Sequence, residues 1–353
     1  GTGWTGSSDV AGRFFATRTY MSLPSRMSRT LKAGLSVSLL VALVAWIATH
    51  DGVDSTLAAL GRMDTRWFVA GIVVQLLAVA AGVVRWRVLL ASQRVELGLS
   101  FLTRHYLIGR FVGVFTPSTL GLDGYRVLAA SRETGRTAAS ARAVLIEKGL
   151  SFTALALTSF ALLPLGAARF YGVGGLLASL ALGVVALGGL LVMHRPDLLR
   201  ALATHSPARL RAPLNKLLSA LAADPVSPAQ LVGACGLGTV TQLCSALTFV
   251  CTGLALGVSA TLVELLVVGH AIVLAMLIPV SVAGAGLREG TAVAMLGLVG
   301  VPVGDALLVG VLGFVVTQPA AILGGIFQVI EGARERASLA PEAHAGLGVL
   351  SGG

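Results

Sequence analysis

The chain has 353 residues, of which 55% are hydrophobic and only 12% are charged. A soluble globular domain carries about 25% charged residues, so this composition excludes one and indicates a helical protein that crosses a membrane several times. The net charge of +10 comes from 26 basic and 16 acidic residues. The basic residues are spread over short loops rather than gathered on one folded face, which argues against a nucleic-acid-binding protein.

The N-terminal residues 1–30 are polar, basic and rich in Gly and Ser. No short apolar segment with a cleavage site follows them, so we predict a disordered cytoplasmic tail that leads into a retained signal-anchor helix. The first two spans are expected at Ala33–Ala48 and Trp67–Val84. The second span ends at Arg85-Trp86-Arg87, and a basic flank with a Trp is typical of a cytoplasmic boundary.

The next apolar run, Leu97–Val114, predicts an interfacial or re-entrant helix rather than a complete span, because Arg104, His105 and Arg110 interrupt it. It leads into a first broken segment around Pro117, in which charges appear within apolar sequence. A bilayer tolerates irregular backbone and charge only where protein or a water-filled cavity surrounds them. We therefore expect this segment to line a polar site, and the basic residues 124–142 after it to be cytoplasmic.

The second half of the chain is more apolar. Gly149–Ala168 and Phe170–Met193 predict a hairpin of two spans, and the basic segment His194–Lys216 predicts a long cytoplasmic loop with amphipathic character. Two further spans are expected at Leu231–Leu256 and Thr261–Ile278. A second broken segment, 279–290, follows, and the last span is expected at 306–330, before a disordered tail at 333–353.

The predicted fold is therefore all-α: a polytopic membrane protein with about eight transmembrane helices and two broken or re-entrant segments over residues 31–332. The positive-inside rule places both termini in the cytoplasm and the protein in the cell (inner or plasma) membrane. Cys235, Cys244 and Cys251 lie in one apolar run, and an odd buried set argues against disulfides or a metal site. We expect no cofactor and no metal.

The two broken segments align as an internal repeat. When Pro117 is set over Pro279, Gly124 falls over Gly286 and Arg126 falls over Arg288. Transporters built from structural repeats place their substrate sites at paired interrupted helices of this kind. The alternative is a pair of unrelated cytoplasmic turns whose arginines reach the membrane interface.

Four stretches of the chain resemble the lysylphosphatidylglycerol synthase-type transmembrane domain, a flippase-like family. They are Arg85-Trp86-Arg87-Val88-Leu89-Leu90, Pro117 to Arg126, Ala143-Val144-Leu145-Ile146-Glu147-Lys148 and Pro279 to Gly290. The resemblance implies translocation of aminoacylated phospholipids or polyprenyl-linked sugars. Leu122 stands where the family often has Gly, and Lys148 where Arg is commoner. Because little sequence follows the last helix, we expect no fused synthase domain and no synthase activity.

We predict that guanidinium groups at the two breaks bind a lipid phosphate through forked hydrogen bonds, and that neighbouring carboxylates hold them when no lipid is bound. The candidate headgroup-binding residues are Arg126, Arg288, Asp123, Glu289 and Ser281. The candidate backbone breaks are Pro117, Gly121, Gly124, Pro279, Gly284 and Gly286. The candidate supporting residues are Arg110, Glu147 and Lys148; a scaffold role is equally open for Arg110, and interfacial anchoring is favoured for the other two.

The leading hypothesis is a flippase or translocase for an anionic, aminoacylated or polyprenyl-phosphate-linked lipid, with membrane lipids as its partners and no catalytic residue. A membrane-embedded glycosyl- or phospho-transferase is the first alternative, with Asp123, Glu147 and Glu289 as its only plausible carboxylates. The second alternative is a non-transporting scaffold subunit for an envelope-synthesis enzyme. A homo-oligomer or such a partner enzyme fits any of these hypotheses.

Overall fold

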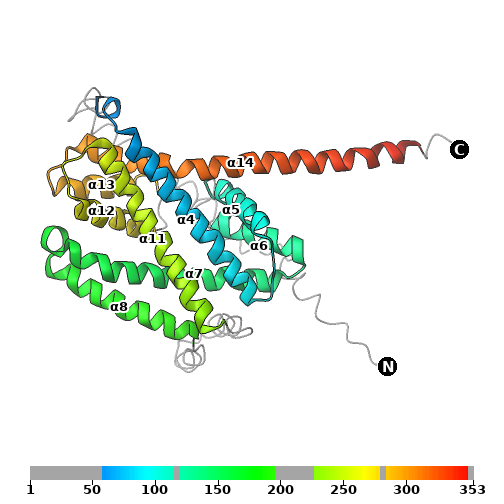
Figure 1. Ribbon diagram of the computed structural model, residues 1–353, viewed down its shortest axis with the longest axis horizontal. Helices are drawn as coiled ribbons and strands as arrows, with labels where there is room; N and C mark the ends of the chain where they lie inside the picture. Colours follow the sequence, from blue (N-terminus) through cyan, green and yellow to red (C-terminus); the bar gives the residue numbers. More distant parts are fainter. Residues whose placement is uncertain (1–57, 115–119, 195–225, 279–283, 349–353) are drawn as a thin grey trace, which may run out of the picture.

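The computed structural model describes residues 58–114, 120–194, 226–278 and 284–348, and every structural statement below refers to them. This part of the chain is helical, without strands (Figure 1). The helices are α4 (Thr65–Ser92), α5 (Leu99–Val114), α6 (Leu120–Thr134), α7 (Thr137–Leu162), α8 (Gly172–His194), α11 (Pro228–Leu256), α12 (Leu262–Ala275), α13 (Leu287–Gly297) and α14 (Val303–Gly348). The expected first span, Ala33–Ala48, and most of the expected loop at 194–216 lie outside the described residues.

Four helical stretches in the described part are long and apolar enough to cross a membrane: 65–92, 137–191, 228–256 and 303–333. The stretch 137–191 contains both α7 and α8, which pack against each other as the expected hairpin. A 3₁₀ turn and a π turn join them, and the π turn ends at Gly172, whose φ of 57° favours glycine. The chain is therefore a helical membrane protein; the total of about eight crossings stays a prediction.

Two segments are helical where the sequence led us to expect otherwise. Residues 124–142, expected as a cytoplasmic loop, form most of α6 and the start of α7, and only Gly135-Arg136 separates the two helices. Gly135 has a φ of 70°, which ends α6 there. The C-terminal tail, expected to be disordered from residue 333, continues α14 as far as Gly348, because Glu, Arg, Ala and Leu dominate its start and favour helix.

The helices occur in the same order twice. A long helix, two short helices separated by a break, and a second long helix make up α4–α7, and the same sequence of elements makes up α11–α14. α8 lies between the two sets. The structure thus extends the repeat predicted from Pro117 and Pro279 to four helices on each side.

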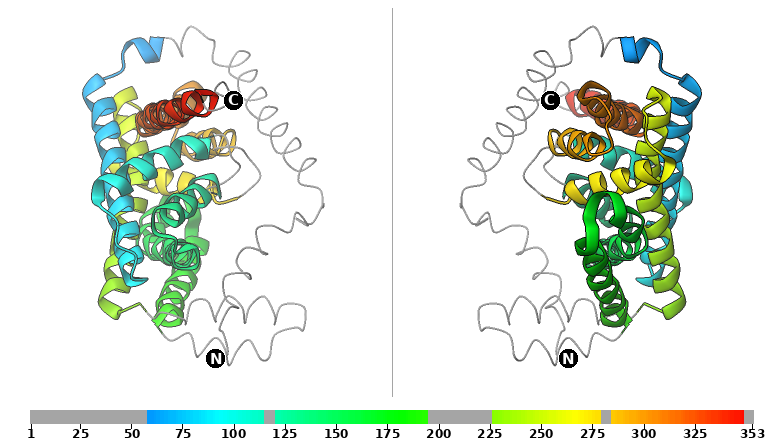
Figure 2. Two further views of the ribbon diagram at one scale, coloured as in Figure 1. Left: turned by 90° about the vertical axis from the view of Figure 1, so that its right-hand side faces the viewer. Right: turned by 90° about the vertical axis from the view of Figure 1, so that its left-hand side faces the viewer.

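The packing follows a two-fold pattern as well. α4 and α11 lie side by side (Figures 1 and 2), α4 packs on α7 as α11 packs on α14, and α5 pairs with α6 as α12 pairs with α13. The Asp64 N–H at the start of α4 donates to the Ala255 carbonyl near the end of α11 at 2.8 Å, so the two central helices are antiparallel. Because α4 and α11 are equivalent helices of the two repeats, superimposing one repeat on the other reverses the direction in which the helices run. This is the relation found in inverted-topology repeats.

The contacts between the two halves are unequal: α5 packs closely on α14, whereas α12 touches α7 only slightly. α5 lies directly on α14, where a Cβ on Gly324 would come within 2.0 Å of the Leu107 carbonyl oxygen. The equivalent pair, α12 on α7, meets over a much smaller area, where Ser159 Oγ and His270 Nε2 are hydrogen-bonded at 2.8 Å. The short-helix pair of the first half is therefore clamped to the opposite half more tightly than its counterpart.

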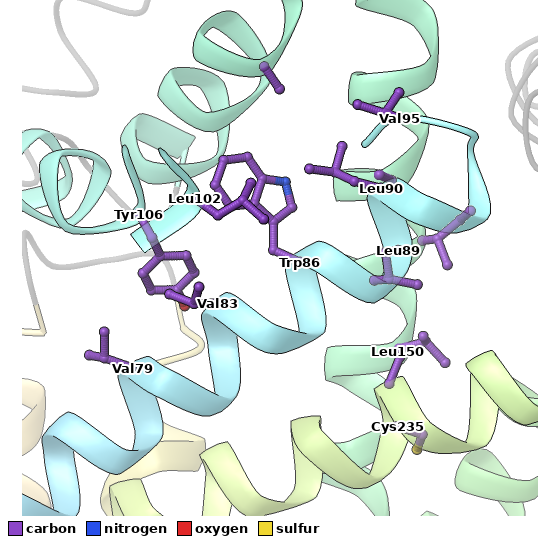
Figure 3. Close-up of a cluster of buried hydrophobic side chains, with 14 of the residues drawn as sticks. Val79, Val83, Trp86, Leu89, Leu90, Val95, Leu102, Tyr106, Leu150 and Cys235 are labelled. Carbon is purple, nitrogen blue, oxygen red and sulfur yellow. The ribbon is translucent and has the colours of Figure 1, made fainter. Parts of the chain in front are cut away.

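The apolar core of the first half surrounds Trp86, which is fully buried on α4 (Figure 3). Leu89 and Leu90 of α4 pack there with Leu102 of α5 and Leu150 of α7. A second core holds Leu265, Ile272 and Leu296 of α12 and α13. Each short-helix pair is therefore anchored by side-chain packing and presents its polar residues at fixed positions.

The α5–α14 contact gives a direct stability test. Gly324→Ala should lower the free energy of unfolding by about 1–3 kcal/mol, because its methyl group would collide with the backbone at Leu107 and force the helices apart. Gly332→Ala on the same helix has no atom within 4 Å of the new Cβ and should be neutral or slightly stabilising. Thermal unfolding of both variants in detergent checks this; equal melting temperatures would contradict the close approach.

Candidate functional site

A cluster of five charged side chains joins α4, α6 and α7. Glu147 on α7 accepts hydrogen bonds from Arg85 Nη2 and from Arg126 Nη1, both at 2.8 Å. Asp123 accepts from Arg126 Nη2 at 2.6 Å through one oxygen, and its other oxygen lies 2.6 Å from Lys148 Nζ. We call these five residues the ion network.

Arg85 and Glu147 of the ion network lie well inside two helices that are long and apolar enough to cross a membrane. Arg85 precedes Ser92, the last residue of α4, by seven residues, which corresponds to about 10 Å of helix. Glu147 follows Thr137, the first residue of α7, by ten residues, or about 15 Å. Arg126 is only 2% exposed, and all other members except Lys148 are buried. Charges in such a position persist only when they are paired and hydrogen-bonded.

Two aromatic rings flank the central arginine. The Arg126 guanidinium carbon lies 5.3 Å from the ring centroid of Trp86 on α4 and 5.1 Å from that of Tyr106 on α5. Figure 3 shows the two rings beside each other on these helices. A guanidinium over aromatic faces gains a cation–π attraction that strengthens when water is excluded. Arg126 is therefore fixed by four helices: α4, α5, α6 and α7.

The charges of the ion network do not cancel. Arg85, Arg126 and Lys148 carry three positive charges, whereas Asp123 and Glu147 carry two negative ones. The network therefore has one excess positive charge. The Lys148 side chain is 37% exposed, which makes it the accessible edge of an otherwise closed cluster.

A second charged cluster lies at the start of α13. Arg288 Nε donates to Glu289 Oε1 at 3.0 Å, and the Arg288 guanidinium carbon lies 4.7 Å from the ring centroid of Phe314 on α14. The other oxygen of Glu289 accepts from the Gly286 backbone N–H at 2.7 Å. This carboxylate thus occupies the Gly286 amide at the N-terminus of α13. One cation and one anion leave the cluster neutral.

Arg126 and Arg288, expected to share one cavity, belong to different clusters. α6 packs on α5 and α7, whereas α13 packs on α12 and α14, and no bond between described residues joins the two arginines. Their positions in the aligned repeat also differ. Arg126 is in the second turn of α6, and Arg288 is the second residue of α13. A direct role of either one in headgroup binding stays a prediction.

The predicted breaks are only partly described. Pro117, Pro279 and Ser281 lie outside the described residues. Gly284 and Gly286 have φ angles of 76° and 83°, which other residues rarely adopt. Gly121 and Gly124 instead lie within α6, and a Cβ on Gly124 would meet no atom within 4 Å.

Several polar residues turn out differently from the sequence interpretation. Glu147, read as an interfacial anchor, is the bridge between two buried arginines. Arg85, read as the end of a span, belongs to the ion network because α4 continues to Ser92. The apolar Leu89-Leu90 after it was the signal that could have shown this. Glu264 caps α12 by accepting from the Thr261 N–H, and His270 is buried and hydrogen-bonded to Ser159.

Together these features define a helical integral membrane protein with a buried, positively charged ion network between its long helices. The chain belongs to the family described as the lysylphosphatidylglycerol synthase TM region, whose model matches residues 32–324. This match confirms the family named from the sequence motifs. Comparison with curated proteins and with solved structures found no match.

The ion network should depend most strongly on Glu147. Glu147→Gln leaves Arg85 and Arg126 buried with only Asp123 between them, and should lower the free energy of unfolding by about 3–5 kcal/mol. Glu133→Gln on the exposed face of α6 is the matched control and should change it little. Adding Arg85→Met to Glu147→Gln should recover part of the loss, since it removes one unpaired charge. Denaturation in detergent measures all three; a double variant no more stable than Glu147→Gln would contradict the pairing.

Proposed function

We propose that this protein moves a lipid with a phosphate-bearing, anionic headgroup between the leaflets of the cell membrane. The observation that carries the proposal is the ion network, in which three basic side chains meet two carboxylates inside the helical bundle. The family match and the apolar spans support a lipid-related membrane protein. Within that class, the excess of basic over acidic side chains in the network favours an anionic ligand.

The chemistry of lipid movement fits such a network. A bare charge at the bilayer centre costs at least about 2.5–3.5 kcal/mol, so an unassisted headgroup crosses very slowly. A positive region with one accessible edge at Lys148 offsets this cost for a phosphate. Asp123 and Glu147 hold the three cations together against their mutual repulsion. The same carboxylates can accept hydrogen bonds from an amine, which would suit an aminoacylated headgroup.

The helix arrangement supports transport as well. Arg136 at the end of α6 donates to the Arg94 carbonyl just before α5, so this pair of helices enters and leaves at the same end of the bundle. We propose that α5–α6 and α12–α13 are re-entrant hairpins of an inverted repeat, and that the end with Arg94 and Arg136 faces the cytoplasm. Interrupted helices of this kind line substrate paths in transporters.

The transferase alternative has weaker support. Asp123 and Glu147, two of its three candidate carboxylates, are each held by cations, and Glu289 lies in the separate cluster. Carboxylates whose oxygens are already held in this way are not placed to take a proton from a substrate. No observation specifically favours a scaffold subunit.

Lys148 provides the test of transport. With the full chain in vesicles, Lys148→Gln removes the excess charge of the ion network and should slow the movement of a fluorescent phosphatidylglycerol about tenfold or more. Lys148→Arg keeps the charge and should retain most of the rate. Bleaching of the outer-leaflet label by dithionite reports the rate.

Arg132→Gln, a charge change on the exposed face of α6, serves as the control and should transport like the wild type. The proposal is wrong if wild-type vesicles bleach no faster or further than protein-free vesicles. It is equally contradicted if Lys148→Gln transports at the wild-type rate.

A further inference from the structure

Arg110, in the last part of α5, differs from the other arginines buried in the bundle. Arg85, Arg126 and Arg288 each lie within hydrogen-bond distance of a carboxylate. Arg110 forms no ion pair with any described residue; its Nε is buried without a hydrogen-bond partner there, as are those of Arg85 and Arg126, but its terminal nitrogens bond to no carboxylate. The side chain as a whole is partly exposed, so its outer nitrogens are not sealed off.

Arg110 lies inside the membrane-spanning part of the molecule. Near the start of α5, Arg104 pairs with Glu331 of α14 at 3.2 Å. Further along α5, a Cβ on Gly325 would meet the Phe111 ring at 3.0 Å. Glu331 and Gly325 are six residues apart, so α5 descends along α14 by about 9 Å between these contacts. An unpaired guanidinium at that depth is unfavourable unless an anion joins it.

Arg110 also lies next to the ion network. Tyr106, whose ring flanks Arg126 at 5.1 Å, is four residues before Arg110 on α5 and therefore on the same face of the helix. Between them, Gly109 lets α6 approach, because a Cβ there would come within 2.7 Å of Leu122. Arg110 is thus one helical turn from the network, on the side toward the first break.

We propose that Arg110 is the residue that binds the phosphate group directly, in place of Arg126. Both terminal nitrogens of Arg126 already bond to Asp123 and Glu147, so a phosphate would have to displace a carboxylate. Arg110 needs no such exchange, and its guanidinium can form two parallel hydrogen bonds to phosphate oxygens. This inference rests on the proposed function: the ion network supplies the positive surroundings and Arg110 supplies the contact.

The test uses the purified full chain in a neutral detergent with dihexanoyl-phosphatidylglycerol as the probe. The lipid should raise the melting temperature of the wild type, since it binds only the folded state. The diacylglycerol with the same chains should not. Arg110→Gln should weaken the apparent affinity for the phospholipid about tenfold, Arg110→Lys should weaken it less, and Arg132→Gln should match the wild type.

Folding of the variant is checked in the same experiment. Without lipid, Arg110→Gln should melt at or above the wild-type temperature, because it removes an unpaired buried charge. A stable Arg110→Gln protein that still binds the phospholipid with wild-type affinity would overturn the inference. So would a wild-type response to the diacylglycerol equal to that with the phospholipid. Inorganic phosphate separates the sources: an equal, Arg110-dependent shift with phosphate alone assigns the site to free phosphate, whereas a shift only with the lipid assigns it to a headgroup.

Binding and transport can fail separately. If wild-type vesicles move no lipid but the phospholipid binds in an Arg110-dependent way, the phosphate site stands and the transport proposal falls. If lipid moves and Arg110→Gln both binds and moves it like the wild type, transport stands and the role of Arg110 is wrong.

Discussion

The bridge that Glu147 makes between Arg85 and Arg126 is the interaction on which the first half of the molecule depends. It ties α4, α6 and α7 together through side chains that are almost fully buried. Removing the Glu147 carboxylate would leave two guanidinium groups buried without this partner, and removing the arginines would leave the carboxylate buried without a cation. The bridge therefore holds the three helices in their relative positions. The aromatic rings of Trp86 and Tyr106 extend the same constraint to α5.

A second constraint comes from the unequal contacts of the two halves. Two sets of four helices with the same order and matching neighbours would form identical interfaces if the symmetry were complete. Instead, Gly324 allows backbone contact between α5 and α14, while α12 and α7 meet mainly at Ser159 and His270. When the two halves of an inverted repeat have different conformations, exchanging these conformations between the halves generates a second, related arrangement of the helices.

The sequence predicted the helical membrane class, the four long apolar stretches and the family, because apolar length and basic flanks are local signals. The span expected at Thr261–Ile278 is instead the shorter helix α12. It also identified Asp123 and Arg126, since charges within apolar sequence stand out. It could not show that Glu147 reaches both Arg85 and Arg126, because these contacts join residues 62 and 21 positions apart. The aligned arginines Arg126 and Arg288 were expected to bind the same headgroup. Their helices start at different points of the repeat, and each arginine pairs with a carboxylate on its own helix.

The difference between the two charged clusters follows from their electrostatics. Arg288 and Glu289 form an ion pair, and Glu289 also accepts a hydrogen bond from the Gly286 amide, so the charges of this cluster are balanced. The Arg288 guanidinium lies over Phe314, which places α13 against α14. Among the described residues, the ion network has three cations and two carboxylates, and Arg110 adds a further cation one turn away. Cations so close together repel one another, and the proposed phosphate ligand would relieve that repulsion. The proposed binding site therefore draws on the first repeat, whereas the charged cluster of the second repeat is satisfied internally.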